Sequence, residues 1–117
     1  MSDVLHHECG IALIRLLKPI EFYEKKYGSY QYGLSRLYIL MEKQRNRGQD
    51  GAGVVGVKID MPPGYKYMDR VRSCEANPIQ DVFNKIQEPF TGEVSKGKDA
   101  CWAKQNLPFI SEVYLGH

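Results

Sequence analysis

The sequence predicts an α+β protein, because segments with the pattern of β-strands alternate with segments that have the spacing of amphipathic helices. Runs rich in β-branched and aliphatic residues occupy 9–16, 52–59 and 111–117. Apolar residues recur with helical spacing within 30–48 and 79–86. With 117 residues, of which 43% are hydrophobic and 26% are charged, the chain has the size and composition of one soluble globular domain.

The composition also argues against several classes of protein. Sixteen basic and 14 acidic residues give a net charge of +2, too small to point to nucleic acid or to a membrane surface. No apolar run approaches the roughly 20 residues of a membrane span, and the start MSDVLHHE is not a secretory signal. The three cysteines, Cys9, Cys74 and Cys101, form no CxxC pair, so we expect no disulfide framework, no structural zinc and a cytoplasmic location.

The first predicted element is a strand over 9–16, with the sequence CGIALIRL. Alternate positions are apolar on both faces, with Ile11 and Leu13 on one face and Ala12 and Ile14 on the other. A strand that is apolar on both faces is typical of one covered on both sides, and we expect that here.

The next segment, 20–29, is charged and aromatic, and we expect an exposed loop. A helix follows within 30–48, and Gly48 is its predicted C-cap. The apolar positions that predict this helix lie at i, i+3, i+4 and i+7: Leu34, Leu37, Tyr38 and Met41.

The second half of the chain continues the alternation. Two prolines and a glycine at 62–64 predict a turn between two antiparallel strands. The segment 88–108 is polar and contains glycine, so we expect loops there. The remaining predicted elements are strands at 52–59, 66–73 and 111–117 and a helix at 79–86.

Two local patterns resemble ligand-binding motifs but are better explained by local structure. Gly51, Gly53 and Gly56 match the GxGxxG spacing of dinucleotide-binding proteins, but that motif needs a strand before the glycines and a helix after them, and here the order is reversed. We therefore expect the glycines to permit a tight turn into the strand. The potential metal ligands of HHEC at 6–9 alternate in direction along an extended chain, which favours a solvated leader over a metal site.

Two single residues carry weak signals. Arg47, in NRGQDGAG, is either a cation at a helix end or an arginine that holds an anionic substrate on a helix-to-strand loop. Cys9 stands alone in an apolar run, where a cysteine is most often a small buried hydrophobe and less often a nucleophile.

Three motifs in order carry a resemblance to a known family. They are CGI at 9–11, RGQDGAG at 47–53 after a helix, and LGH at 115–117. In this combination the chain resembles the class II glutamine amidotransferase (glutaminase) domain. The RGQD form resembles the amidophosphoribosyltransferase branch, which begins purine synthesis. The likeness runs from Cys9 to His117 and is weak over 60–111.

The resemblance implies a fold and a domain organisation. The family has the four-layer αββα sandwich of the N-terminal nucleophile hydrolases, which we expect to be incomplete in this chain. Residues 1–8 would be a leader or propeptide, and 9–117 the N-terminal part of a glutaminase domain, truncated at its C-terminal end.

The resemblance also implies a mechanism. Cys9 would be the nucleophile and its own freed α-amine the general base, with Arg47 and His117 near the bound substrate. An α-amine has a pKa of about 8 and can take a thiol proton near neutral pH, whereas an amide nitrogen cannot. The Glu8–Cys9 bond would therefore have to be cut first, plausibly by attack of the Cys9 thiol on the Glu8 carbonyl.

The chain departs from the family pattern at several places. Ala12 and Leu13 replace the usual residues after the first motif, a long segment is inserted at 15–33, and Asn46 stands where many members have histidine. In the family, an arginine that grips the substrate carboxylate, an Asn-Gly pair that builds the oxyanion hole and an aspartate that holds the substrate amine would follow His117. We therefore expect the 117-residue chain by itself to be inactive.

The same resemblance implies ligands and partners. Glutamine would be the substrate, a phosphoribosyltransferase domain would receive the ammonia, and the whole enzyme would be a homo-oligomer. That enzyme would use Mg²⁺ with phosphoribosyl pyrophosphate, and an iron–sulfur cluster bound by later cysteines, as in some relatives, is left open. Cys74 and Cys101 are expected to be structural. The alternatives are another class II amidotransferase, such as glucosamine-phosphate synthase or asparagine synthetase, or a non-catalytic interaction domain that retains the fold.

Overall fold

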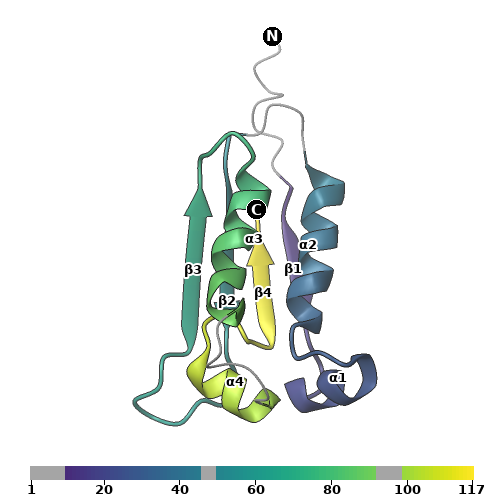
Figure 1. Ribbon diagram of the computed structural model, residues 1–117, viewed down its shortest axis with the longest axis vertical. Coiled ribbons are helices and arrows are strands. Elements are labelled where there is room, and N and C mark those ends of the chain that lie inside the picture. Colours follow the sequence, from purple (N-terminus) through teal and green to yellow (C-terminus); the bar gives the residue numbers. More distant parts are fainter. Residues whose placement is uncertain (1–9, 46–49, 92–98) are drawn as a thin grey trace.

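A four-stranded antiparallel sheet forms the centre of the computed structural model, which describes residues 10–45, 50–91 and 99–117. The strand order is β1-β4-β2-β3, so the last strand along the chain lies between the first and the second (Figure 1). The strands are β1 (Ala12–Arg15), β2 (Ala52–Val57), β3 (Met68–Ser73) and β4 (Val113–Gly116).

Two of the four α-helices within the described ranges cover one face of this sheet. Helix α2 packs on β1 and β4, and α3 packs on β2 and β3 (Figure 1). The other two, α1 and α4, contact each other beyond the lower end of the sheet in this view. The helices are α1 (Ile20–Tyr27), α2 (Tyr32–Gln44), α3 (Pro78–Gln87) and α4 (Ala100–Asn106), and a 3-10 turn, η2 (Glu88–Thr91), follows α3.

The core lies between the sheet and helices α2 and α3, as the helical periodicity predicts. Leu34, Leu37 and Met41 of α2 are buried, and α3 buries every apolar residue of its stripe. The sheet contributes Tyr114, 1% exposed, whose ring lies against Gly33. The Tyr114 hydroxyl donates to the carbonyl of Phe109 and accepts from the backbone N–H of Ser111.

The opposite face of the sheet is open and largely apolar. In the strand register Leu13, Leu115 and Val55 stand side by side on this face. Leu13 is 62% exposed and Leu115 is 44% exposed, and Ile11, which precedes β1, is 67% exposed. The two-sided cover expected for the first strand is therefore absent among the described residues, where β1 is an edge strand packed on one face only.

Other elements differ from the sequence expectations. The segment expected to be an exposed loop at 20–29 contains α1, which buries only Ile20, and the loop-rich segment at 88–108 contains η2 and α4. Helix α2 ends at Gln44 with Arg45 as its C-cap, not at Gly48, which lies outside the described residues. The three remaining predicted strands and the helix at 79–86 are confirmed to within two residues at each end. Among the described residues, no helix is long and apolar enough to cross a membrane.

Candidate functional site

Three of the four predicted site residues, Glu8, Cys9 and Arg47, lie outside the described residues. The fourth, His117, is described and follows β4. The structure does describe residues next to the others in sequence: Gly10 after Cys9, and Arg45 and Asp50 on the two sides of the segment that contains Arg47. These neighbours and His117 are the described residues at the candidate site.

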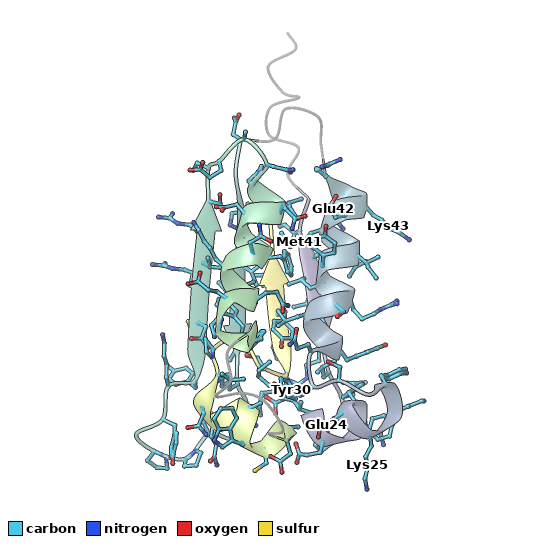
Figure 2. All side chains as sticks on the ribbon, viewed as in Figure 1. Glu24, Lys25, Tyr30, Met41, Glu42 and Lys43 are labelled. Atoms are coloured by element: carbon cyan, nitrogen blue, oxygen red, sulfur yellow. The ribbon has the colours of Figure 1, made fainter. Side chains whose placement is uncertain are left out.

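Gly10 lies against the end of helix α2. A Cβ atom on Gly10 would stand 2.7 Å from Oε1 and 2.8 Å from Cβ of Gln44, so only glycine fits without a shift of that side chain. Gly10 and Gln44 also line a small cavity with Met41, Ile79 and His117. Figure 2 shows Met41 directed from α2 toward the sheet and Lys43 directed outward. The first and last described segments of the chain thus meet at this end of the sheet.

His117 pairs with Gly53 at the start of β2. The backbone N–H of each residue donates to the carbonyl of the other at 3.0 Å. A Cβ on Gly53 would lie 2.7 Å from Nε2 of His117, so the imidazole occupies the space that the missing side chain leaves. The glycines of this segment were expected to permit a tight turn into the strand, but Gly53 and Gly56 lie within β2 and leave room for neighbouring side chains.

Three sequence motifs that are far apart in the chain therefore converge. Gly10 belongs to the first motif, Gly53 to the second, and His117 to the third. Gly53 contacts His117 directly, and Gly10 shares a cavity with it. That cavity has a volume of about 10 Å³, which is the space of one water, so at this end of the sheet the described residues alone provide no pocket for an amino-acid substrate.

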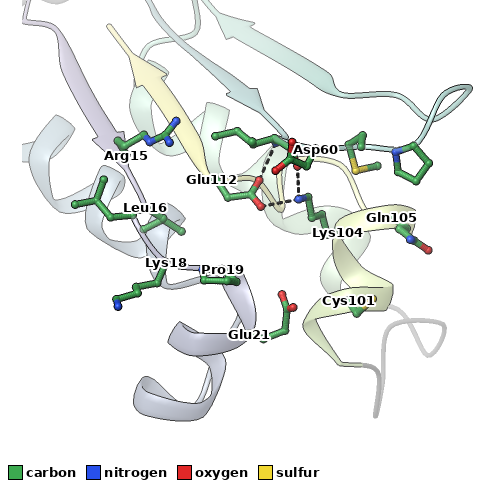
Figure 3. A pocket seen from close by; sticks show the side chains of 14 residues that line it. Arg15, Leu16, Lys18, Pro19, Glu21, Asp60, Cys101, Lys104, Gln105 and Glu112 are labelled. Atoms are coloured by element: carbon green, nitrogen blue, oxygen red, sulfur yellow. Dashed lines mark hydrogen bonds and ion pairs between the residues drawn. The ribbon is translucent and has the colours of Figure 1, made fainter.

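A larger cavity, with a volume of about 440 Å³, lies at the opposite end of the sheet, between β1, α1, α4 and the turn after β2 (Figure 3). An ion pair between Lys104 Nζ and Glu112 Oε2 at 2.6 Å forms part of its wall. Glu112 Oε1 also accepts from the N–H of Ile59 at 2.9 Å, and Lys104 donates to the Ile59 carbonyl.

These charged side chains have structural partners. Behind the ion pair, the buried Lys58 ammonium donates to the carbonyls of Lys104 and Leu107 at 2.5 and 2.7 Å. Burial lowers the pKa of Lys58. The network fastens the turn after β2 to α4 and to the start of β4, which explains its burial without a catalytic role. Sequence reasoning did not find it, because Lys58, Lys104 and Glu112 are far apart in the chain and belong to no motif.

Other candidate ligands are dispersed. In the described ranges, no group of three or more histidine, cysteine, aspartate or glutamate side chains is placed to hold a metal ion. Cys74 and Cys101, expected to be structural, are both exposed free thiols. The GxGxxG spacing falls on a strand that follows a helix, as expected from its order in the sequence, and does not form the turn between a strand and a helix that cradles phosphate.

Comparisons of the chain with protein-family models, with curated proteins and with solved structures found no match.

Proposed function

We propose that the chain is the N-terminal part of a class II glutaminase domain of the amidophosphoribosyltransferase type. The observation that carries the proposal is the convergence of Gly10, Gly53 and His117 at one end of the sheet. Each residue belongs to one of the three motifs on which the resemblance rests, and the motifs are about 40 and 60 residues apart in sequence. If the three short motifs matched the family by accident, they would not be expected to lie together in the folded chain.

The open face of the sheet supports the same proposal. Four-layer αββα domains pack two sheets face to face, each with helices on its outer side. The described residues form one sheet with helices on one face and an apolar, exposed second face that includes Leu13 and Leu115. Contiguous exposed apolar surface of this kind typically marks an interface. We propose that a second sheet of the same domain packs there.

The proposed chemistry begins at Cys9. Once the Glu8–Cys9 bond is hydrolysed, the free α-amine takes the thiol proton, and the thiolate attacks the side-chain carbonyl carbon of glutamine. The carbon–nitrogen bond breaks, ammonia leaves with the transferred proton, and a γ-glutamyl thioester remains. Water hydrolyses the thioester, which releases glutamate and restores the thiol.

The remaining parts of the proposal follow from the same family. Arg47 and His117 border the bound glutamine, and the ammonia displaces pyrophosphate from phosphoribosyl pyrophosphate, with Mg²⁺, in a phosphoribosyltransferase domain. The whole protein is proposed to be a homo-oligomeric, cytoplasmic enzyme.

Intact mass and glutamate release test this proposal, using a chain extended through the rest of the glutaminase domain. We expect a mass that lacks residues 1–8, glutaminase activity, and covalent labelling of Cys9 by a glutamine analogue that carries an electrophilic carbon in place of the amide. Cys9→Ala should abolish activity and labelling, whereas the matched control Cys101→Ala, on an exposed thiol, should keep both.

Three results would separate the parts of the proposal. Activity that survives in Cys9→Ala would refute the assignment of the nucleophile. A folded, processed protein with neither activity nor labelling would favour the non-catalytic interaction domain. A Cys9→Ala chain that still loses its leader would show that a separate protease makes the cut.

A further inference from the structure

Helix α1 carries two acidic and two basic side chains. The Glu24 carboxylate accepts a hydrogen bond from the backbone N–H of Ala100 in α4, and Glu21 lines the large cavity. The lysines Lys25 and Lys26 are exposed. Figure 2 shows Glu24 on the side of α4 and Lys25 extending away from the body of the molecule. The Glu24 carboxylate is therefore turned toward α4, whereas both lysines of α1 are exposed.

Aromatic rings lie among these cations. The ammonium groups of Lys18 and Lys26 each stand 5.7 Å from the centre of the Phe22 ring, and Lys26 is also 5.5 Å from the centre of Tyr27. Phe22 is 40% exposed and Tyr27 is 48% exposed. We call these four side chains, Lys18, Phe22, Lys26 and Tyr27, the α1 surface.

Contacts with Tyr23 and Tyr32 hold the two aromatic rings of the α1 surface in place. Tyr27 stacks on Tyr32 of α2 with ring centres 4.2 Å apart and an angle of 12° between the planes. Tyr32 in turn stacks on Tyr23 at 5.2 Å, and Tyr23 meets Phe22 edge to face at 5.2 Å. Aromatic side chains that are already ordered lose little conformational entropy when a partner binds, which is why such rings are enriched at interfaces.

The charges of the α1 surface remain available to a partner. Within the described part of the chain, no carboxylate forms an ion pair with Lys18, Lys25 or Lys26. Cation–π contacts at exposed sites are weak and leave the ammonium group able to bind a carboxylate. The surface therefore presents unneutralised positive charge beside exposed, ordered rings.

We propose that the α1 surface binds a short acidic protein segment that carries an aromatic or large aliphatic side chain. Carboxylates of that segment pair with Lys18 and Lys26, and its apolar side chain packs on Phe22 and Tyr27. Four side chains are too few for a standard globular interface, which favours a short segment as the occupant. The α1 surface itself contains two lysines, fewer than the clustered cations of a nucleic-acid-binding stripe. This inference does not depend on the proposed glutaminase function.

Fluorescence anisotropy with a labelled peptide tests the proposal on the 117-residue chain. The probe is an eight-residue peptide of six glutamates with one central tryptophan and one leucine, and glutamine replaces every glutamate in the control peptide. We expect the acidic peptide to bind more tightly than the control, with an affinity that falls as salt is raised. The variant Lys18→Gln/Lys26→Gln should bind it about fivefold more weakly, as the loss of two exposed charge pairs implies.

Matched variants separate the α1 surface from general charge. The variant Lys43→Gln/Lys85→Gln removes one lysine from α2 and one from α3, so it changes the net charge by the same amount as the α1 double variant. It should bind the peptide as the parent chain does. Phe22→Leu should weaken binding about threefold, whereas Tyr65→Leu, at another exposed aromatic residue, should not. Thermal unfolding followed by circular dichroism verifies that each variant is folded.

Two sets of results would overturn the proposal. One is no binding of the acidic peptide, or equal weakening by the α1 and the α2/α3 double variants. The other is tighter binding of a single-stranded oligonucleotide or of anionic vesicles, lost in the same α1 variant, which would assign the surface to a different class of partner.

Discussion

Gly53 and His117 are joined by a reciprocal pair of backbone hydrogen bonds of 3.0 Å, and the imidazole lies over the glycine. We predict that Gly53→Ala moves the imidazole, because the new Cβ would stand 2.7 Å from Nε2. His117 is exposed and its side chain can turn aside, so the free energy of unfolding should fall by less than about 1 kcal/mol. The measurement is the position of the His117 ring resonances by NMR, together with chemical denaturation. Unchanged ring resonances would show that the contact is not populated in solution.

A second prediction concerns Gly33→Ala. Gly33 is the second residue of α2, and alanine stabilises a helix relative to glycine by at most about 1 kcal/mol. Here the added Cβ would lie 2.6 Å from Cε2 of Tyr114, a buried ring whose hydroxyl has two hydrogen-bonding partners and which cannot turn away. We expect net destabilisation of about 1–3 kcal/mol, measured by chemical denaturation. The control is Ser35→Ala on the exposed side of the same helix, which should be neutral or slightly stabilising. A stabilised Gly33→Ala would contradict this packing.

The third prediction concerns Tyr114→Phe. The Tyr114 hydroxyl donates to the Phe109 carbonyl at 2.6 Å and accepts from the Ser111 N–H at 3.0 Å. Phenylalanine keeps the ring but leaves both buried backbone groups without this partner, so we expect a loss of about 1–3 kcal/mol in unfolding free energy. The exposed Tyr65→Phe serves as the control and should change stability little. Equal effects of the two substitutions would indicate that water reaches the Tyr114 hydroxyl.

The same hydroxyl predicts a dependence on pH. Burial raises the pKa of Tyr114 above its ordinary value of about 10, because the folded state disfavours the phenolate. The associated stability is fully present below pH 10 and is lost as the pH rises further, since only the unfolded chain then ionises readily. The stability advantage of the parent chain over Tyr114→Phe should therefore shrink by roughly 1.4 kcal/mol per pH unit above pH 10. Urea denaturation at pH 9 and pH 11 measures it, and a constant difference would argue against burial.

The fifth prediction concerns the ion pair of Lys104 and Glu112. Both side chains are at least four-fifths buried, and Glu112→Gln leaves the Lys104 ammonium without its carboxylate. We expect a loss of about 2 kcal/mol in unfolding free energy. Arg45→Gln, which breaks an exposed pair of 3.8 Å with Glu42, should cost less than about 0.5 kcal/mol.

A double variant completes this prediction. Lys104→Met/Glu112→Leu removes both charges together, so it should be less destabilised than Glu112→Gln alone. A double variant that is more destabilised would show that the hydrogen bonds to Ile59 matter more than the charge balance.

The sequence correctly predicts those helices and strands in which buried residues recur at regular intervals. Helix α3 buries Ile79, Val82, Phe83 and Ile86 on one side, which is the spacing that predicts it. Helix α1 buries one residue of eight and exposes aromatic rings, so its pattern resembles that of a loop. Helix α4 is seven residues long, and its one local signal is Asp99, whose carboxylate caps the helix by accepting from the N–H of Trp102.

The arrangement of the candidate site depends on strand order, which periodicity does not contain. Nothing in the local pattern around Gly53 indicates that it lies opposite His117. That relationship arises because β4 lies between β1 and β2 in the sheet. The strand order depends on packing between segments that are far apart in the sequence. The resemblance to a family implied a common site, and local physical reasoning alone did not.

The position of β4 also sets the order of events during synthesis. Strand β1 joins the sheet only through β4, and the paired residues Ala12 and Gly116 are separated by almost the entire chain. Such a high contact order slows folding, since a long loop must close before its contacts form. On the ribosome, β2 and β3 can pair early as a hairpin, whereas β1 waits without a partner until residue 116 has emerged. Strand β1 is therefore translated before its partner and paired last, so any maturation that depends on the paired geometry of β1 cannot precede the emergence of residue 116.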